Sequence, residues 1–191
     1  MNRIHLASAS PRRRELLERL GLRVELCPSH IEEVRRSGED PGAFALRAAR
    51  EKLEAAGPFP PGEAALAADT IVVIDGEVLG KPRHEDEAAR MLGTIQDRWH
   101  TVFTGLAVAY QGVVHSGVEA SRVKIAPLTR AEIDWYVATG EPMDKAGAYA
   151  LQGIGGLFVE RVEGSCSNVI GLPLPLLRRF FSRLGLFLPP A

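Results

Sequence analysis

Hydrophobic and polar positions follow two different periods along the chain, one typical of strands and one typical of helices. Apolar or alternating runs predict strands at 4–7, 64–74, 77–79, 101–110, 113–125 and 157–162. Apolar residues spaced three or four apart predict helices over 11–21, 41–57, 85–95 and 129–140, with a last one within 172–188. Strands and helices therefore alternate over most of the chain.

Turn and capping residues mark several boundaries of these elements. Ser10-Pro11 and Asp40-Pro41 each place a capping side chain before a proline that can start a helix. Thr129 and Glu132 match a capping box, which begins another helix. Asp75-Gly76 is typical of a tight turn and folds the strand over 64–74 back into a hairpin.

Alternating strands and helices combined with hairpins predict an α/β fold with a mixed, curved sheet and flanking helices. At 191 residues the chain fits a single domain over 1–191, with room for two lobes. Its net charge of -1 argues against a general nucleic-acid binder, although a local basic pocket for a small anion remains compatible.

The cysteine content and the two ends of the chain indicate a cytoplasmic protein. Cys27 and Cys166 have no partners at metal-ligand spacing, so we expect two ordinary half-buried thiols in a reducing compartment. A signal peptide is not evident. The apolar stretch 172–188 is interrupted by arginines and too short to span a bilayer, which favours a core or dimer-interface helix over membrane contact.

The segment from Ser8 to Arg14 is the first unusual feature. Arg12, Arg13 and Arg14 stand in the opening turn of a helix, where the helix dipole already places positive charge. A bound polyphosphate explains them, because free backbone N–H groups and guanidinium groups would then converge on one anion. The alternative is a solvated basic patch.

Asp69 is the second unusual feature, because it interrupts a run that otherwise reads as a buried strand. Burying an unpaired carboxylate is costly, so we expect a metal ion or a cationic partner beside it. A general base or a metal ligand fits this position. The alternative is a structural ion pair with a lysine or arginine of the core.

Two lysines and one acidic pair are further candidates. Lys52 falls on the small-residue face of its helix, although its stem could also extend outward. Lys81 can pair with phosphate as a single charge, but the sequence around it does not match a P-loop. Only one carboxylate of Glu32-Glu33 can face a site, and the residues by themselves favour a solvated loop for the pair.

Two later positions have less specific patterns. His100 has no ligand or catalytic partner at a suitable spacing, so we expect it to form a hydrogen bond at a strand end. The glycine-rich stretch 144–156 would let the main chain approach a ligand, and Gln152 offers a donor and an acceptor together. A flexible loop explains this stretch equally well.

Short motifs in order along almost the whole chain resemble the Maf family of nucleoside triphosphate pyrophosphatases. The matching segments are Ser8-Ala9-Ser10-Pro11-Arg12-Arg13, Ala68-Asp69-Thr70, Gly80-Lys81-Pro82, Thr104-Gly105, Gly140-Glu141-Pro142, Asp144-Lys145-Ala146-Gly147-Ala148-Tyr149, Gln152-Gly153 and Asn168-Val169-Ile170-Gly171-Leu172-Pro173. The resemblance implies a two-lobed fold with a deep cleft, related to inosine-triphosphate pyrophosphatases. It also implies a protein that is often a homodimer and that depends on a divalent cation, Mg²⁺ or Mn²⁺.

The resemblance further assigns roles to residues. It implies that Asp69 is the proton acceptor that activates water, and that Glu33 is a candidate ligand of the metal, together with Asp69, or of water. Residues that it places along the cleft, where they would bind the triphosphate, are Ser8, Arg13, Lys52, Lys81 and Lys145. Glu32 departs from the aspartate that relatives often carry, and this puts little in doubt.

The identity of the base rests on three more positions. Arg12, Thr70 and Gln152 resemble the branch of the family that acts on dTTP and UTP. A glutamine amide suits uracil or thymine, but the same amide can flip to suit cytosine. We therefore expect dTTP, UTP or modified pyrimidine triphosphates to be hydrolysed to the monophosphate and pyrophosphate. The alternatives are non-standard purine triphosphates, or a nucleotide-binding regulator of cell division or septum formation.

Overall fold

A computed structural model describes residues 3–29 and 31–186. Within these residues, seven strands form one mixed sheet in the order β2-β1-β3-β5-β6-β7, with β4 paired to β3. Strand β1 is parallel to both β2 and β3, whereas the β3–β4 and β6–β7 pairs are antiparallel. The strands are β1 Arg3–Leu6, β2 Arg23–Leu26, β3 Ala64–Ile74, β4 Glu77–Leu79, β5 Trp99–Tyr110, β6 Val113–Ile125 and β7 Val159–Glu163.

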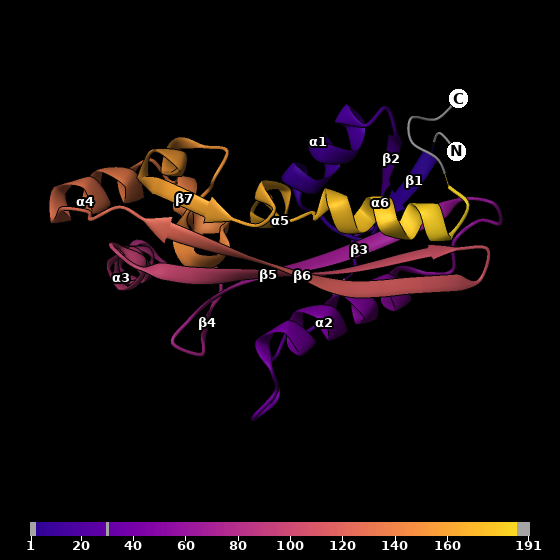
Figure 1. The fold of residues 1–191 in the computed structure, drawn as a ribbon, viewed down its shortest axis with the longest axis horizontal. Coiled ribbons are helices and arrows are strands. Elements are labelled where there is room, and N and C mark those ends of the chain that lie inside the picture. Colours follow the sequence, from indigo (N-terminus) through magenta and orange to yellow (C-terminus); the bar gives the residue numbers. More distant parts are fainter. Residues whose placement is uncertain (1–2, 30, 187–191) are drawn as a thin grey trace. The chain divides into compact units, whose positions relative to one another are not determined.

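Helices flank this sheet (Figure 1). The α-helices are α1 Pro11–Arg19, α2 Pro41–Ala56, α3 Glu85–Ile95, α4 Arg130–Ala138, α5 Cys166–Ile170 and α6 Leu174–Arg183. The 3₁₀ helices are η1 Glu141–Asp144, η2 Ala146–Ala148 and η3 Ile154–Phe158. The mixed sheet with flanking helices confirms the fold class that the sequence predicts.

The structure differs from the predicted elements at a few places. Strand β2 was not expected, because it has only four residues and three of them are exposed; it pairs in parallel with β1. The glycine-rich stretch forms short 3₁₀ helices, and β7 starts two residues later than predicted. The last helix covers 174–183, and residues 187–188 of the predicted stretch lie outside the described residues.

The chain folds into two compact units. The first comprises described residues of 1–69, 104–119 and 171–191. In this unit α1 and α6 cover one face of the sheet and α2 covers the other (Figure 1). Leu17, Leu66, Leu106, Leu177 and Phe181 belong to the core under α1 and α6, so the last helix is a core helix as predicted.

The second unit comprises residues 70–103 and 120–170 and has a core of its own. Leu92 and Ile95 of α3, Ile125 of β6 and Tyr136 of α4 are almost completely buried in it. The expectation of a single domain over 1–191 stays a prediction.

The predicted capping box at the start of α4 is confirmed. The Thr129 side chain accepts from the backbone N–H of Glu132, and the Glu132 side chain accepts from the backbone N–H of Thr129. Two N–H groups that the helix itself cannot satisfy are thus paired, which fixes where α4 begins.

Small residues let α2 lie unusually close to the sheet of the first unit. Ala45, Ala48 and Ala49 are completely or almost completely buried on this helix face. A Cβ atom at Gly105 of β5 would lie 2.1 Å from the carbonyl oxygen of Ala45. Because that atom belongs to the helix backbone, it cannot move aside as a flexible side chain would. Glycine at 105 therefore sets the distance between α2 and β5.

His100 forms the hydrogen bond expected of it, within the second unit. Its Nε2 lies 2.8 Å from the Tyr149 hydroxyl, and its Nδ1 has no hydrogen-bond partner among the residues described. Burial lowers the pKa of His100 to about 4. The side chain is therefore a neutral imidazole at physiological pH.

In the described part of the chain, the helices are all too short or too polar to cross a bilayer. Cys27 and Cys166 are both free thiols; Cys27 is half-buried, as the sequence predicts, whereas Cys166 is exposed and that part of the prediction is wrong.

We predict that Gly105→Ala destabilises the protein by about 1–3 kcal/mol, because the added methyl group has to displace the backbone of α2. Chemical denaturation measures the change. Gly93→Ala is the matched control, since the described structure leaves open space around a Cβ atom at that helical position. The control should keep or slightly raise stability, by at most about 1 kcal/mol. Equal effects of the two substitutions would contradict the close approach of α2.

We also predict a pH-dependent contribution of His100 to stability. Its pKa is about 4 in the folded protein against an ordinary value of 6.5. The unfolded chain therefore binds the proton first as the pH falls, and stability decreases between pH 6.5 and pH 4. The full loss is about 3 kcal/mol. Denaturation of the wild type and of His100→Gln at about pH 7.5 and pH 4 measures it, and parallel changes in the two proteins would disprove it.

Candidate active site

Arg13 is a buried cation at the start of α1, in the first unit. Its guanidinium donates from Nε to the Gly171 carbonyl at 2.8 Å and from Nη1 to Ser8 Oγ at 2.9 Å. Burial lowers the pKa of Arg13, and Asp69 acts in the opposite direction. Ser8 lies just after β1 and is itself buried. The structure thus brings Ser8 and Arg13 together, and it adds a contact with Gly171 that was not predicted.

The other two arginines of this turn differ from Arg13. Arg12 is half-buried, whereas Arg14 is exposed and forms an ion pair with Glu18 at 2.7 Å. The expectation that all three guanidinium groups converge is therefore wrong for Arg14, because the helical period turns residue 14 to solvent when residue 13 faces inward. Ser10 occupies the N-cap position of α1, but its side chain makes no capping hydrogen bond.

Asp69 lies inside the sheet and has a cation beside it. Only 3% of the residue is exposed. Its Oδ1 accepts from Lys52 Nζ at 2.6 Å, and its Oδ2 has no hydrogen-bond partner among the residues that the structure describes. The predicted ion pair with a core lysine is therefore present. It gives a hydrogen bond to one carboxylate oxygen, and the other oxygen has none from the described residues.

Lys52 reaches Asp69 because of its place on α2. Residues 65, 67 and 69 of β3 share the face of the strand that α2 covers. Lys52 follows the small residues of the helix by one turn and is 9% exposed, so the interpretation of an outward stem is wrong. Its ammonium makes a second ion pair, with Glu33 Oε1 at 2.8 Å. Two carboxylates therefore share one lysine.

Glu33 comes from the loop between β2 and α2, and nearly half of its side chain, 47%, is exposed. Burial of the remainder and the charge of Asp69 raise the pKa of Glu33, while Lys52 opposes the increase. Its position beside Lys52 is not that of a fully solvated loop residue. Oxygen atoms of Glu33 and the unpartnered Oδ2 of Asp69 are hard donors, which fit Mg²⁺ or Mn²⁺.

The second unit holds the remaining candidates. The Gly147 N–H donates to the Gly80 carbonyl at 3.1 Å, which brings the turn before Lys81 next to the loop after Lys145. Lys81 is exposed, whereas Lys145 donates to the Glu141 carbonyl at 3.0 Å and pairs with Asp144.

A steric constraint places this loop on one face of β3. A Cβ atom at Gly147 would lie 2.9 Å from Val72, so the loop passes close to that side chain. Thr70 stands two residues before Val72 and therefore shares its face. Gln152 is exposed further along the same loop.

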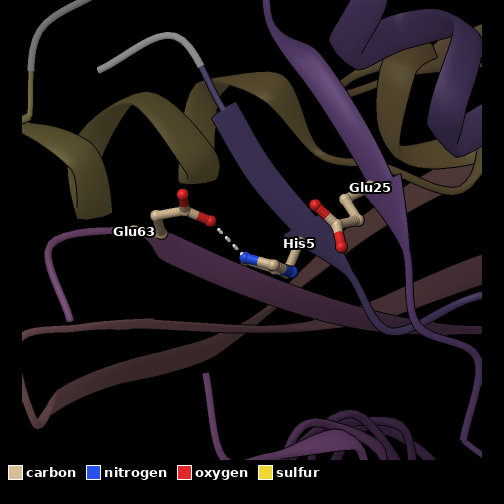
Figure 2. Close-up of side chains that lie close together, drawn as sticks. All are labelled: His5, Glu25 and Glu63. Carbon is tan, nitrogen blue, oxygen red and sulfur yellow. Dashed lines mark hydrogen bonds and ion pairs between the residues drawn. The ribbon is translucent and has the colours of Figure 1, made fainter. Parts of the chain in front are cut away.

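A separate group of metal-ligand type lies where β1 meets its neighbours (Figure 2). His5 stands between Glu25 of β2 and Glu63, and its Nε2 lies 2.5 Å from Glu63 Oε2. Arg3 lies 3.6 Å from Glu25 and 3.5 Å from Glu63. Because Arg3 lies near both carboxylates and His5 also pairs with Glu63, we interpret this group as an ion network that holds the strands together.

We predict that Lys52→Met destabilises the protein by about 3 kcal/mol or more, because it removes the cation that is hydrogen-bonded to the buried Asp69 carboxylate. Chemical denaturation near neutral pH provides the measurement. Adding Asp69→Asn in the same chain removes the buried charge and should recover most of the loss. Losses that simply add in the double variant would show that the two side chains do not depend on each other.

Comparisons with known proteins agree with this fold and with the motifs. A solved structure titled as the Staphylococcus aureus Ham1 protein aligns with a TM-score of 0.52 and 16% identity, over 95% of this chain and 99% of that one. This likeness supports the fold alone.

Sequence relatives are much closer. A protein of Anaeromyxobacter dehalogenans (strain 2CP-1 / ATCC BAA-258) named dTTP/UTP pyrophosphatase is 52% identical, over 98% of this chain and 96% of the relative. A protein of the same name from Myxococcus xanthus (strain DK1622) is 47% identical, over 96% of this chain and 93% of the relative. Another, from Methylobacillus flagellatus (strain ATCC 51484 / DSM 6875 / VKM B-1610 / KT), is 44% identical, over 99% of this chain and 96% of the relative. Residues 3–184 match the family described as Maf-like protein, and the chain belongs to that family.

Proposed function

We propose that this protein hydrolyses dTTP and UTP to the nucleoside monophosphate and pyrophosphate. Relatives that are 44–52% identical over nearly the whole chain have the name of this activity. The proposal also agrees with the cations at the start of α1 and with the acidic pair around Lys52. Water would attack the α-phosphorus in line with the departing pyrophosphate.

The observation that carries the proposal is the Asp69 carboxylate. Lys52 holds Oδ1 at 2.6 Å and so fixes the plane of the carboxylate. Oδ2 is buried and retains its lone pairs, since it has no partner among the described residues. A carboxylate oriented in this way can take a proton from the attacking water. Strand β3 is paired on both sides, so the acceptor is held in place before the substrate binds.

A divalent cation, Mg²⁺ or Mn²⁺, belongs to this proposal. Asp69 and Glu33 would hold it, because their oxygen atoms lie around one lysine and their combined charge exceeds the charge of that lysine. When bound, the cation would neutralise phosphate oxygens and so favour attack at phosphorus.

The remaining residues would bind different parts of the substrate. Ser8, Arg13, Lys52, Lys81 and Lys145 would contact the phosphates, where positive charge stabilises the departing pyrophosphate. Arg13 is already fixed by Ser8 and Gly171, so little side-chain entropy is lost when it binds. Arg12, Thr70 and Gln152 would contact the base. The Gln152 amide would accept from N3–H and donate to O4 of uracil or thymine.

We predict that a panel of triphosphates, assayed with Mg²⁺ or Mn²⁺ and with products identified by chromatography, gives monophosphate and pyrophosphate from dTTP and UTP. Asp69→Asn should lower kcat by about 10²–10⁴-fold, because it removes the proton acceptor. Asp134→Asn is the matched control, since Asp134 is an exposed carboxylate of α4 paired with Arg130. It should keep normal turnover.

Other outcomes would contradict the proposal. Faster release of pyrophosphate from ITP or XTP would favour a house-cleaning enzyme for non-standard purines. Tight binding of nucleotide with no turnover at any metal concentration would favour a regulator of cell division. Normal turnover by a folded Asp69→Asn variant would show that another group accepts the proton.

A further inference from the structure

The loop that carries Gln152 is held by the side chain of Glu141, at the start of η1. Glu141 Oε1 accepts from the Tyr136 hydroxyl at 2.7 Å and from the Gly155 N–H at 2.9 Å. Glu141 Oε2 accepts from the Ile154 N–H at 2.9 Å. One carboxylate thus joins helix α4 to the backbone just beyond Gln152.

These contacts provide acceptors for backbone N–H groups at the start of η3, which the loop does not provide by itself. Ile154 and Gly155 are the first two residues of η3, and their N–H groups have no partner within the helix. Gly153 stands at the N-cap position and has no side chain to accept from them. Glu141 supplies the missing acceptor from thirteen residues earlier in the sequence.

The fit around the carboxylate is close. A Cβ atom at Gly153 would lie 2.3 Å from Glu141 Oε2, and one at Gly155 would lie 2.4 Å from the Tyr136 hydroxyl. Both positions therefore need glycine as long as Glu141 and Tyr136 stay where they are. Neither glycine has a left-handed backbone conformation. The requirement for glycine is therefore steric and does not come from the φ angle.

Tyr136 secures the other end of the same loop. Its ring is completely buried in the core of the second unit, and its hydroxyl accepts from the Ala150 N–H at 3.2 Å while it donates to Glu141. Gln152 thus lies between two anchored points, Ala150 and Ile154. Its own side chain stays exposed and available to a ligand.

The three hydrogen bonds favour the ionised form of Glu141. Burial raises the pKa of Glu141, but donation from the Gly155 N–H, the Tyr136 hydroxyl and the Ile154 N–H outweighs burial, so the pKa is lowered. A glutamine at 141 would turn an NH₂ group toward at least one of these donors. The backbone carbonyl of Glu141, which accepts from Lys145 Nζ at 3.0 Å, would be unaffected by that change.

We propose that Glu141 is a positioning residue for base selection, which fixes the loop 150–155 so that the Gln152 amide meets the pyrimidine in one orientation. This inference rests on the proposed function, in which Gln152 contacts the base. Glu141 itself does not touch the substrate, and its effect passes through the Ile154 and Gly155 amides.

The test measures Glu141→Gln in two independent ways. Amide hydrogen exchange of the nucleotide-free protein should be at least about tenfold faster at Ile154 and Gly155, because both lose a charged acceptor. The kcat/KM for UTP should fall by about 10–100-fold while that for CTP changes little, so that discrimination between the two bases decreases. Placed in a Gln152→Ala chain, Glu141→Gln should leave the UTP to CTP ratio unchanged.

Glu132→Gln is the matched control. Glu132 is also a carboxylate that accepts from a backbone N–H, but it lies in the first turn of α4 and its partner is Thr129, at the end of the helix remote from Glu141. It should alter helix stability without altering the UTP to CTP ratio or exchange at 154 and 155. Tyr136→Phe should reproduce part of the Glu141→Gln effect, since it removes the Ala150 contact and one of three hydrogen bonds to the carboxylate.

Three results would overturn the inference. These are equal losses for UTP and CTP in Glu141→Gln, a change of their ratio in the Gln152→Ala chain, and unchanged exchange at Ile154 and Gly155. Failure of the proposed function looks different, because the wild type would then release no pyrophosphate from either nucleotide. In that case the exchange experiment would confirm the anchoring of the loop, and the absent turnover would refute its role in base selection.

Discussion

A carboxylate placed in the middle of a buried strand requires a cation at the same depth, and the ion pair between Asp69 and Lys52 meets this requirement. Lysine can lie that deep only if its helix comes close to the sheet. The alanines of α2 and the glycine at 105 make this approach possible, because none of them has a side chain that would hold the helix away. The chemistry proposed for Asp69 thus depends on alanine and glycine residues that carry no reactive side-chain group.

Periodicity predicted most of the fold, because strands and helices that bury one face leave a repeating pattern in the sequence. Long elements such as β3, α2 and β6 were found within a residue or two of their ends. Strand β2 could not be predicted, since it is short, three of its four residues are exposed, and its pairing with β1 leaves no period in the sequence. The sequence also could not show which arginine of α1 faces inward, because this depends on the Gly171 carbonyl, 158 residues away.

Residues of the candidate site were found from the sequence where they broke a local rule. Asp69 interrupts an apolar run and Lys52 falls on an apolar helix face, and both proved to be buried and paired. Glu33 broke no rule, and only the family resemblance singled it out. Glu141 belonged to a matching motif, but its function as an acceptor depends on amides at 154 and 155, which no local pattern relates to it.

Tyr136 has a consequence for how order is lost on heating. Its ring packs edge-on against Phe158, with centroids 5.2 Å apart, inside the second hydrophobic core. Its hydroxyl, at the other end of the same rigid side chain, holds the loop that contains Gln152. This loop cannot fray separately, as exposed loops usually do, without pulling on a core residue. Its melting should coincide with that of the unit around it, so the loop behaves as part of the core.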